Sequence, residues 1–218
     1  MKYQAVLFDF DYTLGDATEP IVASYTAGLT AMGWSAPDRE AVRRTVGQTL
    51  QDGYTILTGD RDEARREEFF QRFKEHSMPI MAAQTVLCPG ALDVLLWLAE
   101  RGVSAGIVST KGGDIIDDIF RRLNIRDKLA LIVGGQDVTK ATPDPEGLNL
   151  AVTRLGLDKS AVLFCGDTVI DAGTARRAGV DFCAVLNGTT PAEAFMDYPH
   201  VHISPDLFDL RSWLESLG

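Results

Sequence analysis

The chain has 218 residues, of which 45% are hydrophobic and 24% charged, an ordinary composition for a globular protein. This composition excludes the disordered and collagen-like classes, and the length predicts one large domain or a domain with an insertion. Lysine and arginine number 21 against 31 aspartates and glutamates, and the resulting net charge of −10 argues against nucleic acid or an anionic membrane as a partner.

The three cysteines form no C-x-x-C pair, which favours reduced, buried thiols in a cytosolic protein. The first apolar run is short and meets Asp9, which is unlike a secretory signal. No run approaches the roughly 18 apolar residues that a membrane span needs. We therefore expect a cytoplasmic protein that does not enter a membrane.

In chain order, short apolar runs alternate with segments of helical period. The runs are rich in branched residues and bounded by Gly or Asp, which is typical of buried strands in a parallel sheet. They cover residues 5–8, 103–108, 129–133, 161–165 and 182–186, and a short run at 201–203 is expected at the sheet edge. Gly102, Gly156 and Gly179 follow helical segments, where a left-handed C-cap favours glycine. The alternation predicts an α/β fold: a doubly wound, mainly parallel, Rossmann-like sheet with helices on both faces.

The stretch from residue 35 to about residue 77 contains no strand-like run and is dense in charged residues. The segment before it, 20–33, also has helical period. Two parallel strands can be joined by one crossover helix, so three or four helices indicate an inserted subdomain. We predict an α/β core formed by residues 1–15 and 83–218 and an inserted all-helical domain formed by residues 16–82.

Polar side chains follow four of the predicted strands. They are Asp9 and Asp11 after the first strand, Ser109, Thr110 and Lys111 after the second, Lys140 beyond the third, and Asp167 and Asp171 after the fourth. Ligands of open parallel sheets bind outside the carboxyl ends of the strands. We therefore expect these side chains to converge at one edge of the sheet.

This set of groups is typical of phosphate chemistry. Converging carboxylates repel one another unless a cation lies between them, and oxygen-only ligands suit Mg²⁺. A hydroxyl, an ammonium and backbone N–H groups at helix starts suit a phosphate. One carboxylate can act as a nucleophile and form an aspartyl-phosphate, while a second serves as general acid and base. The residues therefore predict Mg²⁺-assisted phosphoryl transfer.

Each feature alone also has a structural explanation. Asp11 can accept hydrogen bonds in a turn, the pair Ser109-Thr110 and Thr168 can cap helices, and Lys140 can be a solvated surface residue. Their joint occurrence at four strand ends favours the catalytic interpretation.

Four segments resemble the motifs of the haloacid dehalogenase-like superfamily, in its phosphatase branch. Residues 9–14 read Asp-Phe-Asp-Tyr-Thr-Leu, Ser109 ends an apolar strand, residues 140–144 read Lys-Ala-Thr-Pro-Asp, and residues 166–171 read Gly-Asp-Thr-Val-Ile-Asp. The helical insert is similar to the small cap of the phosphoglycolate phosphatase and β-phosphoglucomutase group. The resemblance thus implies a Rossmann-like core with a helical cap.

The resemblance also implies roles for individual residues. Asp9 is implied as nucleophile and Asp11 as general acid and base. Mg²⁺ is the implied cofactor, and its implied ligands are Asp9, Asp11, Asp167 and Asp171. The implied ligands of the phosphoryl oxygens are Ser109, Thr110 and Lys140. A small phosphorylated metabolite is the implied partner.

The sequence departs from the family pattern at two positions. Tyr12 stands where the family usually has Gly, and Ala141 stands where it has Pro. An offset alignment would put Thr142 at the position of the family's Lys, but the Pro143-Asp144 register favours Lys140.

The branches of the family differ at testable positions. Asp11 argues against a dehalogenase, which lacks that acid. A mutase is disfavoured because Ile21 stands at the position of its hinge histidine and the loop 45–50 is uncharged. A Mg²⁺-dependent phosphatase acting on a small phosphomonoester is preferred. The alternatives are a β-phosphoglucomutase-like phosphotransferase, a catalytically idle scaffold and a receiver-like phospho-acceptor. The sequence leaves open the metabolite and the oligomeric state.

Overall fold

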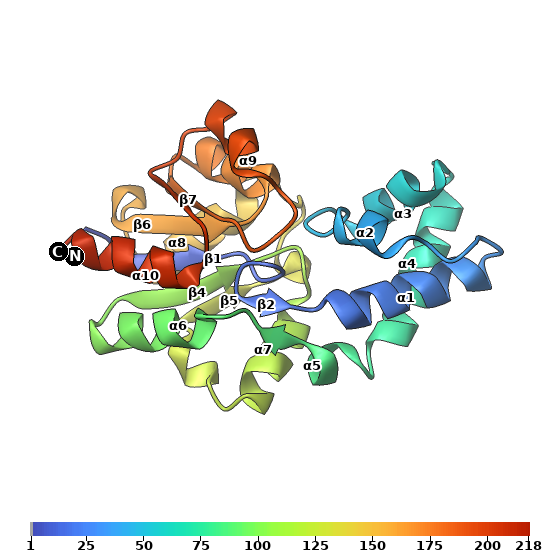
Figure 1. The fold of residues 1–218 in the computed structure, drawn as a ribbon, viewed down its shortest axis with the longest axis horizontal. Helices are drawn as coiled ribbons and strands as arrows, with labels where there is room; N and C mark the ends of the chain where they lie inside the picture. The colour runs from blue at the N-terminus through green and yellow to red at the C-terminus, as the bar shows by residue number, and fades with distance from the viewer. Residues whose placement is uncertain (1) are drawn as a thin grey trace. The chain divides into compact units, whose positions relative to one another are not determined.

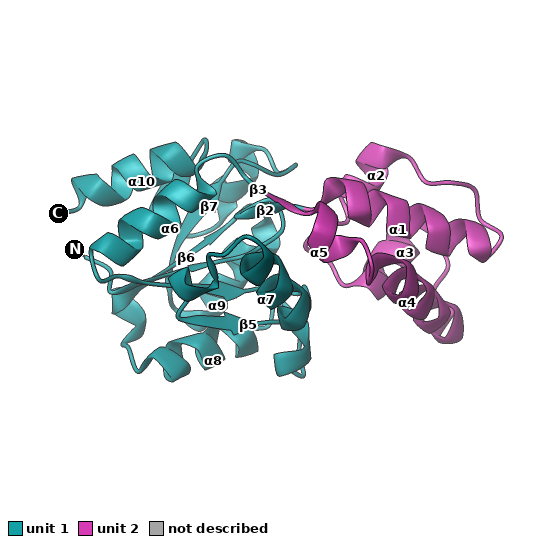
Figure 2. Cartoon of the chain, turned by 90° about the horizontal axis from the view of Figure 1, so that it is seen from below, with its two compact units in different colours: residues 1–16, 87–218 teal, residues 17–86 magenta. Residues whose placement is uncertain are grey.

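A computed structural model describes residues 2–218 of the chain. The chain divides into two compact units (Figure 2): unit 1 comprises residues 1–16 and 87–218, and unit 2 comprises residues 17–86. These divisions fall within four residues of the boundaries expected from the sequence.

Unit 1 contains a six-stranded sheet in which all neighbouring strands are parallel (Figure 1). Its strands are β1 (Ala5–Phe8), β4 (Ser104–Val108), β5 (Leu131–Val133), β6 (Val162–Gly166), β7 (Asp181–Val185) and β8 (His202–Ser204). The order across the sheet is β5-β4-β1-β6-β7-β8. Each predicted strand is present with ends within two residues of those expected, and the short run near residue 202 forms the edge strand β8.

Helices cover both faces of this sheet. They are α6 (Ala91–Glu100), α7 (Gly113–Arg122), α8 (Glu146–Leu155), α9 (Val169–Ala178) and α10 (Leu207–Ser216), with the short 3₁₀ helices η1 (Arg126–Lys128), η2 (Gly135–Asp137), η3 (Lys159–Ala161) and η4 (Ala192–Asp197). Helices α8 and α9 pack together on one face, where Leu148 and Ala175 join a core with Leu7 and Phe164. Helices α6 and α10 lie side by side on the other face (Figure 1). The predicted doubly wound α/β fold is confirmed.

The strand order determines where a site can form. From β1 the chain proceeds to β4 and β5 on one side, and then returns to β6, β7 and β8 on the other. The direction of winding therefore reverses beside β1. Parallel sheets bind ligands at the carboxyl ends of the strands where this reversal occurs. The loops after β4, β1 and β6 meet at this point, because these strands are neighbours in the sheet.

Unit 2 is built from helices. They are α1 (Thr18–Ala31), α2 (Arg39–Arg43), α3 (Leu50–Thr58), α4 (Glu63–Ser77) and α5 (Met81–Gln84). Its core is aromatic: Tyr25 and Tyr54 lie 5.1 and 5.3 Å from Phe69 between ring centroids, and Tyr25 lies 5.3 Å from Phe73. Aromatic pairs at such distances add to the stabilisation from buried area. The all-helical character expected from the sequence is present.

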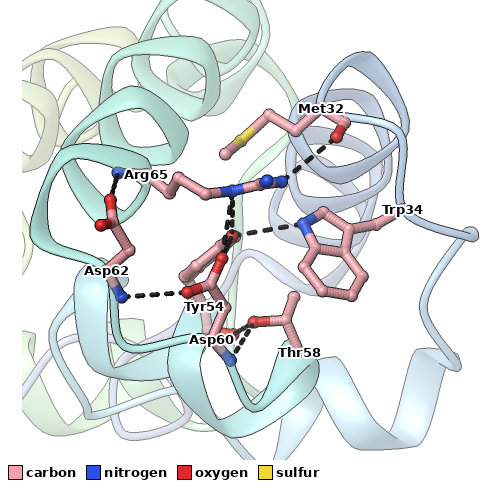
Figure 3. A network of polar contacts seen from close by, with 7 residues as sticks. All are labelled: Met32, Trp34, Tyr54, Thr58, Asp60, Asp62 and Arg65. Atoms are coloured by element: carbon pink, nitrogen blue, oxygen red, sulfur yellow. Dashed lines mark hydrogen bonds and ion pairs between the residues drawn. The ribbon is translucent and has the colours of Figure 1, made fainter.

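A polar network lies at the N-terminal end of α4 in unit 2 (Figure 3). The Tyr54 hydroxyl accepts from Trp34 Nε1 at 3.2 Å and from Arg65 Nε at 3.3 Å, and donates to Asp60 at 2.8 Å. The Arg65 guanidinium also pairs with Asp60 at 3.0 Å and lies 5.5 Å from the Trp34 ring centroid. One hydroxyl thereby ties the loop after α1 to α3 and α4.

Two very short strands, β2 (Gly15–Asp16) and β3 (Val86–Leu87), pair where the chain passes between the units. They were not predicted, because two residues are too few to show an alternating pattern. All three cysteines are buried and free, as expected. Among residues 2–218, no helix is both long and apolar enough to cross a membrane.

Candidate active site

Three carboxylates meet at the carboxyl end of the sheet. Asp9 directly follows β1, Asp167 directly follows β6, and Asp171 lies in the first turn of α9. All three are buried, and one oxygen from each lies within 4.8 Å of the others. The structure therefore brings together three of the four acids expected to share a metal.

Local hydrogen bonds explain these positions. The Asp9 N–H donates to the Cys165 carbonyl at 2.9 Å, which extends the pairing of β1 with β6 by one residue. Thr168 caps α9: its hydroxyl accepts from the Asp171 N–H at 3.3 Å and donates to an Asp171 carboxylate oxygen at 2.6 Å. Thr168 is thus a helix cap, as its position allowed, but the capping box also fixes Asp171 against the other acids.

Burial raises the pKa of all three acids, and the charge of Asp171 adds to the shift at Asp9 and Asp167. Burial raises the pKa of Asp9 well above its ordinary value and the Asp171 charge raises it further, while a hydrogen bond from Ser109 opposes this shift. Burial and the charges of Asp171 and Asp9 raise the pKa of Asp167. Burial raises the pKa of Asp171 to about 6. A hard cation held by oxygen ligands would relieve this repulsion, so the donor set fits Mg²⁺.

Two glycines pack their backbone against these carboxylates. A Cβ at Gly188, in the loop after β7, would lie 1.9 Å from an Asp167 carboxylate oxygen. A Cβ at Gly166 would lie 2.5 Å from the Asp171 Cβ. The contact of Gly188 was not predicted, because a glycine in a surface loop carries no sequence pattern that distinguishes it from other turn glycines.

Ser109 and Asp11 lie beside Asp9 at the ends of β4 and β1. The Ser109 hydroxyl hydrogen-bonds Asp9 and accepts from the Lys111 N–H at 3.3 Å. Asp11 is 14% exposed, and its two carboxylate oxygens accept from Lys111 Nζ at 3.1 and 3.0 Å. Lys111 was noted at this strand end but received no role from the sequence.

Thr110 is half-buried in the loop between β4 and α7. The N-cap of α7 is Gly112, not Ser109 or Thr110. The alternative explanation of these two residues as helix caps is therefore wrong, and their hydroxyl groups do not serve to start α7.

Lys140 is not brought into this cluster. Its side chain is 73% exposed, and its ammonium lies 4.0 Å from Asp144. Glu146 accepts hydrogen bonds from the Lys140 N–H at 2.9 Å and from the Thr139 N–H at 3.0 Å, so the loop closes on the start of α8. Lys140 follows β5, which β4 separates from β1.

A family model for haloacid dehalogenase-like hydrolases matches residues 6–185. The chain belongs to this family. It is 32% identical over 193 residues to the N-acetylmuramic acid 6-phosphate phosphatase of Pseudomonas aeruginosa, covering 86% of this chain and 84% of that protein. It is 27% identical to the phosphoglycolate phosphatase of Rhodospirillum rubrum, covering 97% of this chain and 90% of the relative.

Solved structures agree with this assignment to the haloacid dehalogenase-like hydrolases. A haloacid dehalogenase-like hydrolase from Bacteroides fragilis superposes on this chain with a TM-score of 0.93 at 40% identity, covering 96% of this chain and all of that one. A hydrolase from Streptococcus pneumoniae gives a TM-score of 0.87 at 21% identity, covering 98% of this chain and 99% of that one, which shows the shared fold alone. Together with the phosphatase relatives, these findings show an enzyme that hydrolyses phosphate monoesters.

Tyr12 stands where the haloacid dehalogenase-like motif usually has glycine. Its φ is +58°, in the left-handed region, and its side chain is buried. The chain therefore keeps the backbone conformation that glycine adopts most easily, at a steric cost of about 1–2 kcal/mol for a residue with a Cβ. The N–H of Tyr12 donates to the Gly15 carbonyl at 2.7 Å, which holds the turn closed.

Proposed function

We propose that this enzyme is a Mg²⁺-dependent phosphatase that hydrolyses a small phosphomonoester through an aspartyl-phosphate on Asp9. The observation that carries the proposal is the setting of Asp9: a buried carboxylate hydrogen-bonded by Ser109 and clustered with Asp167 and Asp171. The similarity to phosphatases over most of the chain supports the same reaction.

The proposed reaction has two steps. First, an Asp9 carboxylate oxygen attacks phosphorus, the ester P–O bond breaks, and Asp11 donates a proton to the leaving oxygen. Second, Asp11 takes a proton from water, whose oxygen attacks the same phosphorus. The bond between phosphorus and Asp9 then breaks, releasing phosphate and restoring the free carboxylate. Asp11 returns to its protonated form, so the cycle closes.

The remaining site residues serve this reaction. Mg²⁺, when bound, supplies positive charge against the carboxylates and the phosphoryl group. The residues that would hold it are the side chains of Asp9, Asp167 and Asp171 and the backbone carbonyl of Asp11. Ser109 and Thr110 would donate to phosphoryl oxygens, and Ser109 already lies within hydrogen-bond reach of the nucleophile.

The helical unit, residues 17–86, is proposed to act as the cap that selects the leaving group and excludes water during the first step. The substrate class is a small phosphorylated metabolite, with phosphoglycolate and N-acetylmuramic acid 6-phosphate, the compounds named for the two relatives, as the first to test. Both compounds carry a carboxylate as well as a phosphate.

The test is phosphate release from a panel of phosphomonoesters by the wild type and Asp9→Asn, with Mg²⁺ and with EDTA. The panel holds the two compounds above, hexose and pentose phosphates, nucleotides, pyrophosphate and β-glucose 1-phosphate. We expect metal-dependent release that Asp9→Asn abolishes.

Other results would contradict the proposal. Phosphate release by Asp9→Asn would show that Asp9 is not the nucleophile. Phosphate release in the presence of EDTA would show that the reaction does not need the metal. Conversion of β-glucose 1-phosphate to its 6-phosphate isomer would instead identify a phosphotransferase. Silence of the folded, Mg²⁺-loaded protein on the whole panel would favour an idle scaffold.

A further inference from the structure

We infer that Lys111 supplies the ammonium group that binds the phosphoryl oxygens in this enzyme, in the place that the family resemblance gives to Lys140. The inference rests on the proposed function, since it names a further residue of that site. It follows from the positions, burial and partners of the two lysines.

Lys111 is built into the site. It lies three residues beyond β4, the direct neighbour of β1, and its side chain is only 7% exposed. Its Nζ lies 3.1 and 3.0 Å from the two oxygens of Asp11 and 5.6 Å from the ring centroid of Phe10. A lysine side chain is rarely buried without an anionic partner, because burying an unpaired charge is costly. The ammonium of Lys111 is therefore held beside Asp11 at the strand ends.

The backbone of Lys111 is tied to the nucleophile as well. Its N–H donates to the Ser109 hydroxyl at 3.3 Å, and the same hydroxyl hydrogen-bonds Asp9. Lys111 therefore contacts the proposed general acid directly and is linked to the proposed nucleophile through the Ser109 hydroxyl. A phosphoryl group that is attacked by Asp9, with its leaving oxygen facing Asp11, would lie between these two contacts.

The side chain of Lys140, in contrast, lies in solvent. Its loop follows β5, the edge strand on the far side of β4 from β1. Glu146 accepts a hydrogen bond from the Lys140 N–H. The exposed Lys140 side chain has its Nζ 4.0 Å from an Asp144 carboxylate oxygen. An ion pair this exposed contributes little, and such an ammonium is screened by water rather than directed at one ligand.

An ammonium has three N–H donors, and Lys111 Nζ donates to both carboxylate oxygens of Asp11, so one of these two bonds can be exchanged without losing the contact. Lys111 can thus keep one bond to Asp11 while it donates to a phosphoryl oxygen. It would hold the acid and the phosphate at fixed relative positions and add positive charge beside the phosphoryl oxygens. Charge-assisted bonds of this kind are about twice as strong as neutral ones.

The experiment compares Lys111→Met, Lys111→Arg, Lys140→Met and the remote control Lys128→Met, whose ammonium pairs with Asp127. Two quantities are measured on Mg²⁺-loaded protein: kcat and KM with the best substrate of the panel, and the binding of inorganic phosphate by calorimetry. Urea unfolding of each variant shows whether it is folded.

We expect Lys111→Met to lower kcat/KM by about a hundredfold, the usual cost of losing one preorganised donor to a transition state. It should also weaken phosphate binding. Lys111→Arg should recover part of both, since the positive charge is kept. The loss in Lys140→Met should be at least about tenfold smaller, and Lys128→Met should match the wild type.

A larger loss in Lys140→Met than in Lys111→Met would overturn the inference, and so would wild-type phosphate binding by folded Lys111→Met. Phosphate binding separates this test from that of the proposed function. If the wild type hydrolyses nothing on the panel but binds phosphate through Lys111, the phosphatase proposal fails and the inference stands. If the Mg²⁺-loaded wild type binds no phosphate, the inference fails.

Discussion

Gly188 lies so close to Asp167 that a Cβ on the glycine would come within 1.9 Å of the carboxylate. The neighbouring Asn187 donates from Nδ2 to the Thr13 carbonyl at 3.4 Å, and the Thr13 hydroxyl donates to Asp167 at 3.4 Å. The loops after β1, β6 and β7 thus close around one acid. The absence of a side chain at residue 188 is a condition for this arrangement.

Replacement of Gly188 by alanine should therefore displace Asp167 or push the loop after β7 away from it. Because a shift of about 1 Å in a catalytic group can cost a hundredfold in rate, we expect Gly188→Ala to lose activity on that scale. The Mg²⁺ concentration for half-maximal activity should rise as well. Steady-state kinetics across a Mg²⁺ titration measures both effects.

Gly173→Ala provides the matched control. It lies within α9, and a Cβ there would meet its nearest neighbours at 3.7 Å, an ordinary contact distance. Alanine is the better helix former by about 1 kcal/mol, so this variant should be more stable than the wild type and equally active. Equal kinetics in the two variants would show that the Gly188 contact does not position Asp167.

Much of unit 1 could be predicted from its sequence. Buried parallel strands appear as uninterrupted apolar runs, and the first one or two residues after each run were enough to point to Asp9, Ser109 and Asp167. The strand order was not available, because no local pattern states which strands pair. That order determines which strand ends meet.

The two lysines show the same limit. Lys111 and Lys140 both follow predicted strands, and the family motif favoured Lys140. The structure places β4 beside β1 and β5 at the edge, and only then does Lys111 stand out as the lysine next to Asp11. Position within a motif and position in space are separate properties, and the second depends on pairing between distant parts of the chain.

The left-handed conformation of Tyr12 predicts an unusual order of stabilities. Glycine normally destabilises a structure relative to alanine, but at φ +58° alanine carries the steric cost and glycine does not. With the ring removed in both cases, we expect Tyr12→Gly to be more stable than Tyr12→Ala by about 1–2 kcal/mol. Urea unfolding of the two variants measures the difference, and a more stable alanine variant would contradict the strain.

The Tyr54 hydroxyl predicts a specific loss of stability in unit 2. It makes hydrogen bonds with Trp34, Asp60 and Arg65, and the residue is fully buried. Tyr54→Phe removes the hydroxyl and all three hydrogen bonds, so we expect a loss of about 1–2 kcal/mol in the free energy of unfolding. Chemical unfolding followed by tryptophan fluorescence measures this loss.

Arg72→Ala is the control for that experiment. It removes an exposed helical ion pair with Glu68, which should contribute at most about 0.5 kcal/mol. A loss in Tyr54→Phe no larger than in Arg72→Ala would mean that the hydroxyl network does not stabilise unit 2.

The acid cluster predicts that the metal-free protein becomes more stable as pH falls from 7 to 5. Burial raises the pKa of Asp171 to about 6 in the folded protein, whereas the ordinary value is 3.8. Between these values the folded state binds a proton that the unfolded state does not, so its stability rises as pH falls. For this one group the gain is about 1–2 kcal/mol. Thermal unfolding in EDTA at several pH values measures it.

Two comparisons, with Asp171→Asn and with saturating Mg²⁺, decide whether the cluster causes this trend. Acids with a lowered pKa, such as Asp117 beside Arg121 and Arg126, lose their contribution only below the ordinary range and leave the window from pH 5 to 7 unaffected. Asp171→Asn should flatten the dependence, because the amide does not titrate. Saturating Mg²⁺ should reverse it, because a metal binds the ionised carboxylates and stabilises only the fold that holds them together. A metal-free wild type that loses stability from pH 7 to 5 as steeply as the Mg²⁺-loaded protein would show that burial does not raise the pKa of Asp171.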